Sequence, residues 1–156
     1  MFNNSTEAIA QRKKFLIERK LGICDIVSSC KREKIDASDL GMDDIELRDM
    51  LFYLKKHETV HTLLLTGGNS KNGPEYHLRK QLKENSIQLI PYSHEVPRIH
   101  TFQLNDARTI KVVSLTAPSG SANRAVGGNP QYKALKKQNS NFNTLDFRAL
   151  QYTPFF

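Results

Sequence analysis

The run Val60-His61-Thr62-Leu63-Leu64-Leu65-Thr66 is the stretch that decides the fold. Its apolar character is continuous rather than alternating, which is typical of a strand buried on both faces of a parallel sheet. The strand ends at Gly67-Gly68. Gly73-Pro74 then opens a helix that we expect to run to about Asn85, because proline suits the first helical turn. A strand, a glycine loop and a helix in succession indicate an α/β fold with a largely parallel sheet.

Downstream of this unit the pattern changes to that of a hairpin. Residues 99–104 and 109–115 are rich in β-branched and aromatic side chains and flank the turn residues Asn105-Asp106. The elements expected next are a polar loop over residues 116–124, a helix from Pro130 to about Gln138, and a short helix near residues 144–150. Ligands bind outside the carboxyl ends of strands in such sheets, so we expect a site in the loops after Leu65 and Leu115.

Upstream of the run the sequence predicts two helices and a strand. Ser5 or Thr6 can cap the first helix, and Gly22 can end it. Asp43 and Glu46 have the spacing of a capping box, which predicts that the second helix starts there. The expected segments are a helix over residues 6–20, a strand over 23–27, a charged loop over 31–39 and a helix from 43 to about 56.

The length and composition favour one cytoplasmic domain. No repeat or linker divides the 156 residues, so we expect a single domain over 1–156. Cys24 and Cys30 are too few for a disulfide scaffold and lack the C-x2-C spacing of a zinc knuckle. The longest uncharged apolar run, residues 62–68, is far below the roughly 20 residues that span a bilayer. The polar amino terminus has no secretory pattern, and we expect no membrane association.

The charge balance favours a polyanionic partner. Lys and Arg total 23 against 16 Asp and Glu, which gives a net charge of +7 and a pI near 9.5. Such an excess attracts nucleic acids or acidic membrane surfaces over a Debye length. We place nucleic acid first among the possible partners, and a merely soluble basic protein stays open as the alternative.

Residues 57–61, His-Glu-Thr-Val-His, match the H-E-x-x-H pattern of zinc proteases. That chemistry needs both imidazoles one turn apart on one helix face. Here the second predicted helix ends at His57 and the buried strand contains His61. We therefore interpret the segment as a helix-to-strand connection and expect no metal and no cofactor.

The glycine loop after the buried strand is a candidate pocket or phosphate loop. Its residues Gly67, Gly68, Asn69 and Ser70 follow neither the G-x-x-x-x-G-K-S/T nor the G-x-G-x-x-G pattern. A tight turn into a helix explains the glycines as well as a phosphate site does. In the second interpretation, backbone amides approach a phosphate at the helix amino terminus.

The loop over residues 116–124 is the most informative segment for function. It combines small residues, hydroxyls and an amide, which suit close approach to a sugar-phosphate backbone. Lys133, Lys136 and Lys137 follow and add salt-dependent attraction. An ordinary strand-to-helix loop is the alternative. The candidate DNA-binding residues are Pro118, Ser119, Gly120, Ser121, Asn123 and Arg124.

Together these segments resemble the uracil-DNA glycosylase superfamily, in particular its mismatch-specific and uncharacterised bacterial branches. The resemblance covers residues 12 to about 137, and its most specific part is the Pro-Ser-x-Ser loop within residues 113–123. It implies an α/β three-layer sandwich with a mostly parallel central sheet. It also implies that this loop presses into the DNA minor groove while a uracil or mismatched base rotates out of the stack.

The chain departs from the family at its amino terminus. Family members begin with a strand and a G-x-x-P-like loop whose acidic or amide side chain activates water, and this chain starts after that point. The expected fold is therefore N-terminally shortened, with a gap between residues 23–27 and 62–66. A longer gene product, a second chain, a homo-oligomer or a rebuilt sheet are the ways to fill that gap. The catalytic residue is unassigned, and Asp25 is the weak candidate.

Three functions follow from these patterns. The first is a base-excision N-glycosylase that extrudes a uracil-like base and hydrolyses its glycosidic bond. The second is a non-catalytic glycosylase-like module that binds DNA or a protein. The third is a small-molecule α/β enzyme that uses the Gly67-Gly68 loop.

Overall fold

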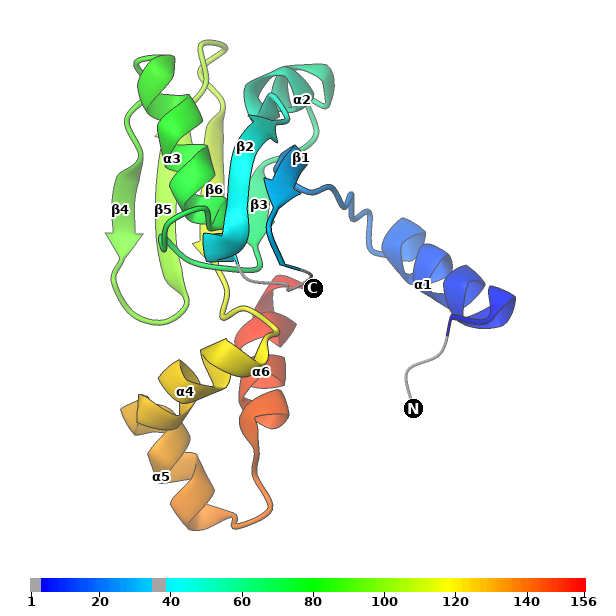
Figure 1. Cartoon of the computed structure of the whole chain (residues 1–156), viewed down its shortest axis with the longest axis vertical. Helices are drawn as coiled ribbons and strands as arrows, with labels where there is room; N and C mark the ends of the chain where they lie inside the picture. The colour runs from blue at the N-terminus through cyan, green and yellow to red at the C-terminus, as the bar shows by residue number, and fades with distance from the viewer. Residues whose placement is uncertain (1–3, 35–38) are drawn as a thin grey trace.

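A computed structural model describes residues 4–34 and 39–156 of the chain and shows an α/β protein. Helices and strands alternate over most of this length (Figure 1). The elements are α1 Thr6–Glu18, β1 Val27–Arg32, η1 Asp39–Gly41, β2 Met42–Leu47, α2 Met50–Lys56, β3 Thr62–Leu65, α3 Pro74–Glu84, β4 Ile90–Ser93, β5 Arg98–Gln103, β6 Thr109–Ser114, α4 Gly120–Gly128, α5 Pro130–Gln138, α6 Thr144–Tyr152 and η2 Thr153–Phe155.

The central sheet has four strands in the order β3-β6-β5-β4. β3 runs parallel to β6, while β6–β5 and β5–β4 are antiparallel. The expected three-layer sandwich with a mostly parallel sheet is therefore wrong. The physical reason is the chain connection, since strands joined by short turns, as β4, β5 and β6 are, can pair only antiparallel. The predicted hairpin around residues 105–106 is confirmed.

β3 matches the strand predicted from residues 60–66, but it lies at the edge of the sheet. Among the described strands it pairs with β6 alone. The expected strand over residues 23–27 does not extend this sheet, because β1 begins only at Val27 and pairs with β2 in a separate two-stranded sheet.

The helix expected from Asp43 starts seven residues later, at Met50. Asp43 and Glu46 belong to β2, where Glu46 accepts a hydrogen bond from Ser29 of β1 (2.7 Å). The side chain of Asp49 caps α2 by accepting from Phe52 N (2.9 Å). The predicted helix start at Asp43 is therefore wrong, because the two acidic residues with capping-box spacing lie in a charged strand that faces the solvent. The loop predicted over residues 31–39 is wrong for Lys31 and Arg32, which belong to β1. Residues 35–38 of this loop lie outside the described part.

The core lies between the sheet and the helices α2 and α3 (Figure 1). α3 buries Leu78 and Leu82 against Phe102 of β5 and against Ile110 and Val112 of β6. Its start at Pro74 and its end at Glu84 confirm the helix predicted from that proline. This packing fixes the first turn of α3 beside the carboxyl end of β6, where the polar residues of the site gather.

The last three helices form a unit beyond the carboxyl end of β6 (Figure 1). Phe147 of α6 and Val126 of α4 are buried, and the Tyr132 ring of α5 meets Phe147 edge-on with centroids 5.6 Å apart. The predicted helices from Pro130 and near residues 144–150 are confirmed as α5 and α6.

α1 confirms the first predicted helix and projects away from the sheet (Figure 1). Ser5 caps it, and none of its residues is buried. Arg19 connects its end to the last residue, donating from Nη1 to the Phe156 carbonyl (2.9 Å). Within the described residues, no helix is long and apolar enough to cross a membrane.

Candidate functional site

The two loops singled out by the sequence lie at one end of the sheet. β3 and β6 are parallel, with Leu65 in register with Ser114, so the chain leaves both strands in the same direction. The glycine loop over 67–73 follows β3, and residues 115–119 follow β6. The open α/β pattern predicts this arrangement, in which a ligand meets both loops.

The glycine loop folds back tightly onto the first turn of α3. A Cβ on Gly73 would lie 2.5 Å from the carbonyl oxygen of Gly68, and one on Gly67 would lie 2.8 Å from the Pro74 ring. Asn72 has a φ of 62° and donates its amide to the carbonyls of Asp39 and Met42 (3.0 Å each). These glycines therefore serve close backbone packing. Asn69 and Ser70 remain exposed.

Glu75 is a buried carboxylate beneath this loop, with 1% of its surface exposed. Its Oε1 accepts from Arg79 Nε (2.9 Å), and its Oε2 accepts from Arg98 Nη2 and from Ser114 Oγ (2.7 Å each). α3, the start of β5 and the end of β6 thus converge on one side chain.

Burial raises the pKa of Glu75, but the hydrogen bonds from Ser114, Arg98 and Arg79 together hold that pKa below its ordinary value. Three hydrogen bonds engage both oxygens and the side chain is 1% exposed, so a water or a substrate has no open approach to this carboxylate. The sequence analysis did not single out Glu75. The available signal was its i,i+4 spacing to Arg79 on a helix.

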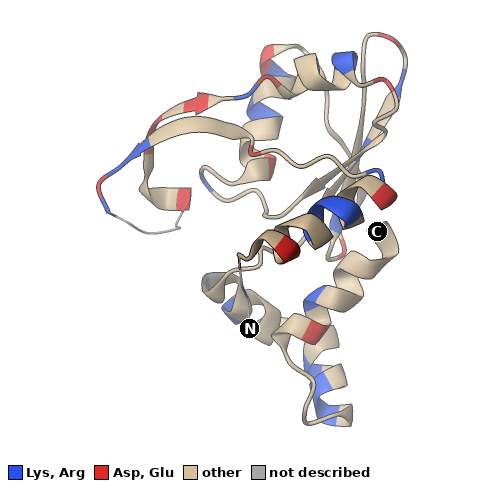
Figure 2. Ribbon diagram, turned by 90° about the vertical axis from the view of Figure 1, so that its right-hand side faces the viewer, with Lys and Arg blue, Asp and Glu red and all other residues tan. Residues whose placement is uncertain are grey.

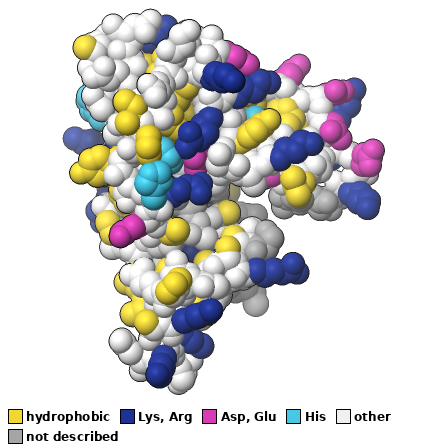
Figure 3. Space-filling view, turned by 90° about the vertical axis from the view of Figure 1, so that its left-hand side faces the viewer, with side chains coloured by type: hydrophobic (Ala, Val, Ile, Leu, Met, Phe, Trp, Pro, Cys, Tyr) yellow, Lys and Arg dark blue, Asp and Glu magenta, His cyan; other side chains and the backbone are white. Residues whose placement is uncertain are grey.

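A hollow of about 260 Å³ opens above Glu75 between α3, β4 and β5. Histidine and Lys or Arg side chains gather on this face of the molecule (Figure 3). The polar residues that line the hollow are Asn69, Glu75, Arg79, His94, Arg98 and His100. Asn69 is the residue of the predicted glycine loop that reaches it.

The loop predicted over residues 116–124 is shorter than expected, because α4 begins at Gly120. Ser119 is the N-cap residue, and its Oγ accepts from Ala122 N (3.4 Å). The prediction of a loop through Arg124 is wrong from Gly120 onward, since a serine N-cap followed by small residues starts a helix. Pro118, Ser119, Gly120, Asn123 and Arg124 are exposed. The side chain of Ser121 lies outside the described part.

Arg148 of α6 holds this segment from below. Its guanidinium donates to the carbonyls of Ala117 and Ser119 (3.1 Å each) and to Asn123 Oδ1 (2.6 Å). Tyr152 adds a bond from its hydroxyl to the Thr116 carbonyl (2.5 Å). The turn and the amino end of α4 are thus fixed by residues about 30 positions away, which the sequence analysis did not identify.

The unit that carries this turn is strongly basic. Residues 115–156 contain five Lys or Arg and a single Asp, a net charge of +4. Lys133, Lys136 and Lys137 are exposed on α5. Figure 2 marks Lys and Arg positions along the ribbon in blue and Asp and Glu positions in red. Residues 23–49, which include both strands of the small sheet, contain eight Asp or Glu against four Lys or Arg, a net charge of −4. Positive charge is therefore concentrated beside the Pro118–Asn123 segment.

The other candidates from the sequence lie outside this end of the sheet. Asp25 is exposed in the connection between α1 and β1. His57 ends α2, and His61 comes just before β3, which confirms a helix-to-strand connection. Across residues 4–34 and 39–156, no three His, Cys, Asp or Glu side chains converge as a metal site requires.

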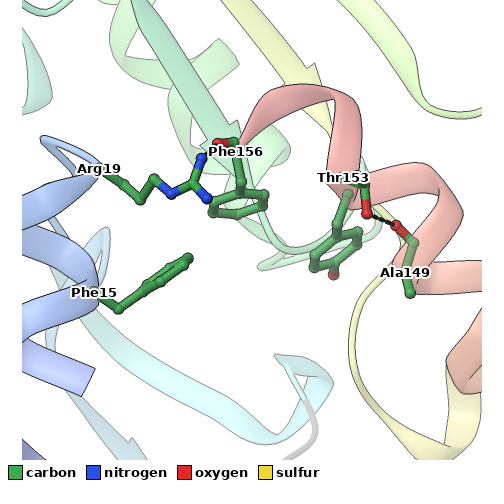
Figure 4. A pocket seen from close by; sticks show the side chains of 6 residues that line it. Phe15, Arg19, Ala149, Thr153 and Phe156 are labelled. Carbon is green, nitrogen blue, oxygen red and sulfur yellow. Dashed lines mark hydrogen bonds between the residues drawn. The ribbon is translucent and has the colours of Figure 1, made fainter. Parts of the chain in front are cut away.

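A second hollow of about 420 Å³ lies between α1 and the carboxyl-terminal segment. Figure 4 shows Phe15 and Arg19 of α1 facing Thr153 and Phe156 across it. Its lining is mostly aromatic and aliphatic, with Arg19 as its one charged side chain. It lacks the several convergent polar groups that mark a specific site for a charged ligand.

Comparison of the chain with protein-family models, with curated proteins and with solved structures finds no match. Function must therefore be argued from the residues and their geometry.

Proposed function

We propose that the protein binds the sugar-phosphate backbone of double-stranded DNA, with the Pro118–Asn123 segment at the contact. The observation that carries the proposal is the unneutralised charge of Arg148. Its guanidinium donates to three carbonyls, those of Ala117, Ser119 and Thr144, and to the amide oxygen of Asn123, all neutral acceptors. None of the ion pairs formed by the described residues includes it.

The geometry of the segment supports the same partner. Gly120 leaves open space where a Cβ would stand, so a phosphate can approach the backbone at the start of α4. The amino end of that nine-residue helix favours negative charge. Arg124 and the three lysines of α5 extend the positive surface beyond the turn.

Excision of uracil or of a mismatched base is the second candidate. It is favoured by the likeness of residues 118–121, at the end of β6, to the Pro-Ser-x-Ser loop of uracil-DNA glycosylases. In that interpretation the turn grips the backbone while the base leaves the stack. Glu75 does not supply the water-activating group, because both of its oxygens already accept hydrogen bonds.

Salt-dependent DNA binding tests the first proposal. We expect the wild-type protein to bind a duplex with an affinity that falls as salt rises. A variant with Lys133, Lys136 and Lys137 changed to Gln should bind about tenfold or more weakly, with a salt slope lower by about 2 to 3. The matched control changes the exposed Lys55, Lys56 and Lys83, on α2 and α3, to Gln. Equal losses in the two variants, or salt-independent binding, would contradict the proposal.

Single-turnover incubation separates excision from binding. The same protein is mixed in excess with duplexes that contain uracil or a G·T mismatch, and abasic sites are measured after alkaline cleavage. Abasic product from these duplexes, and none from a matched duplex, supports the glycosylase. Binding without product supports the non-catalytic module.

A further inference from the structure

The hollow above Glu75 has more positive charge than its own carboxylate neutralises. Arg79 and Arg98 both pair with Glu75, at 2.8 and 2.7 Å. Two guanidinium charges thus face one carboxylate charge. Glu95 lies on the neighbouring loop and forms no ion pair with either arginine. One positive charge is left at the wall of the hollow.

The two guanidinium groups are placed to meet a ligand. The Glu75 side chain is 1% exposed, whereas those of Arg79 and Arg98 are 35% and 39% exposed. The carboxylate therefore lies beneath and fixes the two forks, while part of each fork reaches the solvent. A guanidinium fork matches the paired oxygens of phosphate and carboxylate groups.

His100 fixes one of the two arginines in place. Arg79 Nη2 lies 2.8 Å from His100 Nε2. A guanidinium has no acceptor atom, so Nε2 accepts and the proton of the neutral ring is on Nδ1. His100 is 4% exposed, and its Nδ1 has no partner among the described residues. This nitrogen is closed off from solvent, so His100 serves the hollow by positioning Arg79 and not by donating to a ligand.

Two more polar residues with donor groups line the hollow. The Asn69 amide and the His94 ring are exposed at the rim. Neither forms a hydrogen bond within the described part of the chain. The hollow therefore presents arginine, histidine and amide donors around an excess of positive charge, and its one acidic group is fully engaged.

We propose that this hollow binds the terminal phosphate group of a phosphate ester. A phosphate occupies about two to three times the ~30 Å³ that a water fills in the liquid. The hollow of about 260 Å³ leaves room for the first group esterified to it, such as a sugar. The proposal does not rest on DNA binding by the Pro118–Asn123 segment. A small phosphorylated metabolite and the 5′-phosphate of a nucleic-acid strand share this chemistry.

Calorimetric titration of the full chain tests the site. The probes are inorganic phosphate, ribose 5-phosphate and a short single-stranded oligonucleotide with and without a 5′-phosphate. We expect saturable binding, with one site per chain, of ribose 5-phosphate and of the phosphorylated oligonucleotide. The oligonucleotide without the phosphate should bind at least tenfold more weakly. No saturable binding of any phosphate probe, or equal binding of the two oligonucleotides, would overturn the proposal.

Three variants locate the binding. Arg98→Lys keeps the charge but loses the fork and should weaken phosphate binding at least tenfold. Asn69→Ala removes an exposed rim donor that has no structural bond, so it tests the site even if Arg98→Lys does not fold. It should weaken binding about threefold to fivefold. Lys80→Gln removes an exposed charge of α3 outside the hollow and should leave binding unchanged. A loss in Lys80→Gln equal to that in Asn69→Ala would contradict the site.

The same titrations identify the source of the phosphate. Ribose 5-phosphate that binds as tightly as the phosphorylated oligonucleotide supports a small metabolite as the ligand. A phosphorylated oligonucleotide that binds more than tenfold more tightly supports a strand end. Duplex DNA without 5′-phosphates, bound or not, reports only on the Pro118–Asn123 segment, so the two proposals fail separately.

Discussion

Two side-chain networks stand at the carboxyl end of β6, and they are built in opposite ways. In the first, the Glu75 carboxylate accepts hydrogen bonds from Arg79, Arg98 and Ser114. In the second, the Arg148 guanidinium donates to the carbonyls of Ala117 and Ser119 and to the Asn123 amide. One network surrounds a buried anion with donors, and the other surrounds a cation with neutral acceptors.

The difference separates a structural role for the Glu75 carboxylate, which fixes Arg79 and Arg98, from a binding role for the Arg148 guanidinium. Removing a partner from a buried ion pair leaves an uncompensated charge, so the Glu75 network is expected to govern stability. The Arg148 network leaves a full positive charge under an exposed turn, which supports attraction of an anion. Substitutions that act on one network and spare the other test this distinction.

Glu75→Gln should have the largest effect. It removes the charge that holds two guanidinium groups together, and we expect a loss of about 2–3 kcal/mol of unfolding free energy. This lies below the range for a fully buried pair, because water reaches both arginines. Urea unfolding at neutral pH measures the loss. Glu84→Gln, at the exposed end of the same helix, is the control and should cost under 0.5 kcal/mol. Equal stability of the two variants would show that the Glu75 pairs contribute nothing.

Arg148→Met should mainly lower DNA affinity. We expect a loss of about tenfold, roughly 1.4 kcal/mol, because a charge and the bonds that fix the turn are both removed. Arg148→Lys retains the charge and should lose less. Fluorescence anisotropy with a labelled duplex measures both.

Arg108 supplies the matched control for Arg148. It also bridges two carbonyls, those of Leu54 and Glu58, but its charge is paired with Asp106 (2.8 Å). Arg108→Met should lower stability and leave DNA affinity within twofold. A loss of affinity as large as that of Arg148→Met would remove the argument from unneutralised charge.

The local parts of the fold were predictable from the sequence. Pro74 and Pro130 mark helix starts through a fixed φ and a missing N–H, and both α3 and α5 begin at these residues. The apolar run around Leu63–Leu65 predicted β3, but the expected burial on both faces is wrong, because none of the four residues of this edge strand is buried. Its place at the edge of the sheet was not predictable, since strand order depends on contacts between distant segments.

The errors have local causes too. Asp43 and Glu46 have the spacing of a capping box. Their segment instead pairs with β1 as strand β2, because pairing between strands outweighs the local helix propensity. Ser119 was interpreted as a backbone-gripping hydroxyl, although serine before small residues is also an N-cap. The sequence fits both roles of Ser119, and the position of α4 in the structure shows that it is the N-cap.

The candidate site was predictable only in its location. The two loops after β3 and β6 follow from the α/β pattern. Glu75, Arg98 and Arg148 were not identified, because each acts on residues 23 to 39 positions away in the chain. These distant pairs have no fixed spacing, so no motif reveals them, and the i,i+4 pair of Glu75 with Arg79 was the one contact with a local sequence signal.

The last test uses pH to act on the half of the molecule that holds the Glu75 network and not on the basic segment. All five histidines lie between residues 57 and 100, and none lies in the basic segment 115–156. His77 on α3 and His100 on β5 are both buried. Burial lowers the pKa of His77, and the Lys80 charge adds to this. The Asn72 backbone and the Asp39 carboxylate act in the opposite direction and raise this pKa, but burial outweighs them. Neither ring nitrogen of His77 is in hydrogen-bonding geometry with a partner. Burial also lowers the pKa of His100, against the opposing charge of Glu75.

A lowered folded pKa fixes the sign of the pH dependence. Below about pH 6.5 the histidines of the unfolded chain bind protons that those of the folded chain do not. The free energy of unfolding therefore decreases as the pH is lowered from about 6.5 toward the folded pKa values. Each histidine contributes at most about 1.4 kcal/mol per pH unit. His77→Leu removes one of them, and the fall in unfolding free energy between pH 7 and pH 5 should shrink by about half. Urea unfolding across this range provides the measurement. Amide exchange in α4, where no histidine lies nearby in sequence, should keep its pH-corrected protection as long as the chain stays folded. Identical slopes in wild type and His77→Leu would show that folding does not lower the pKa of His77.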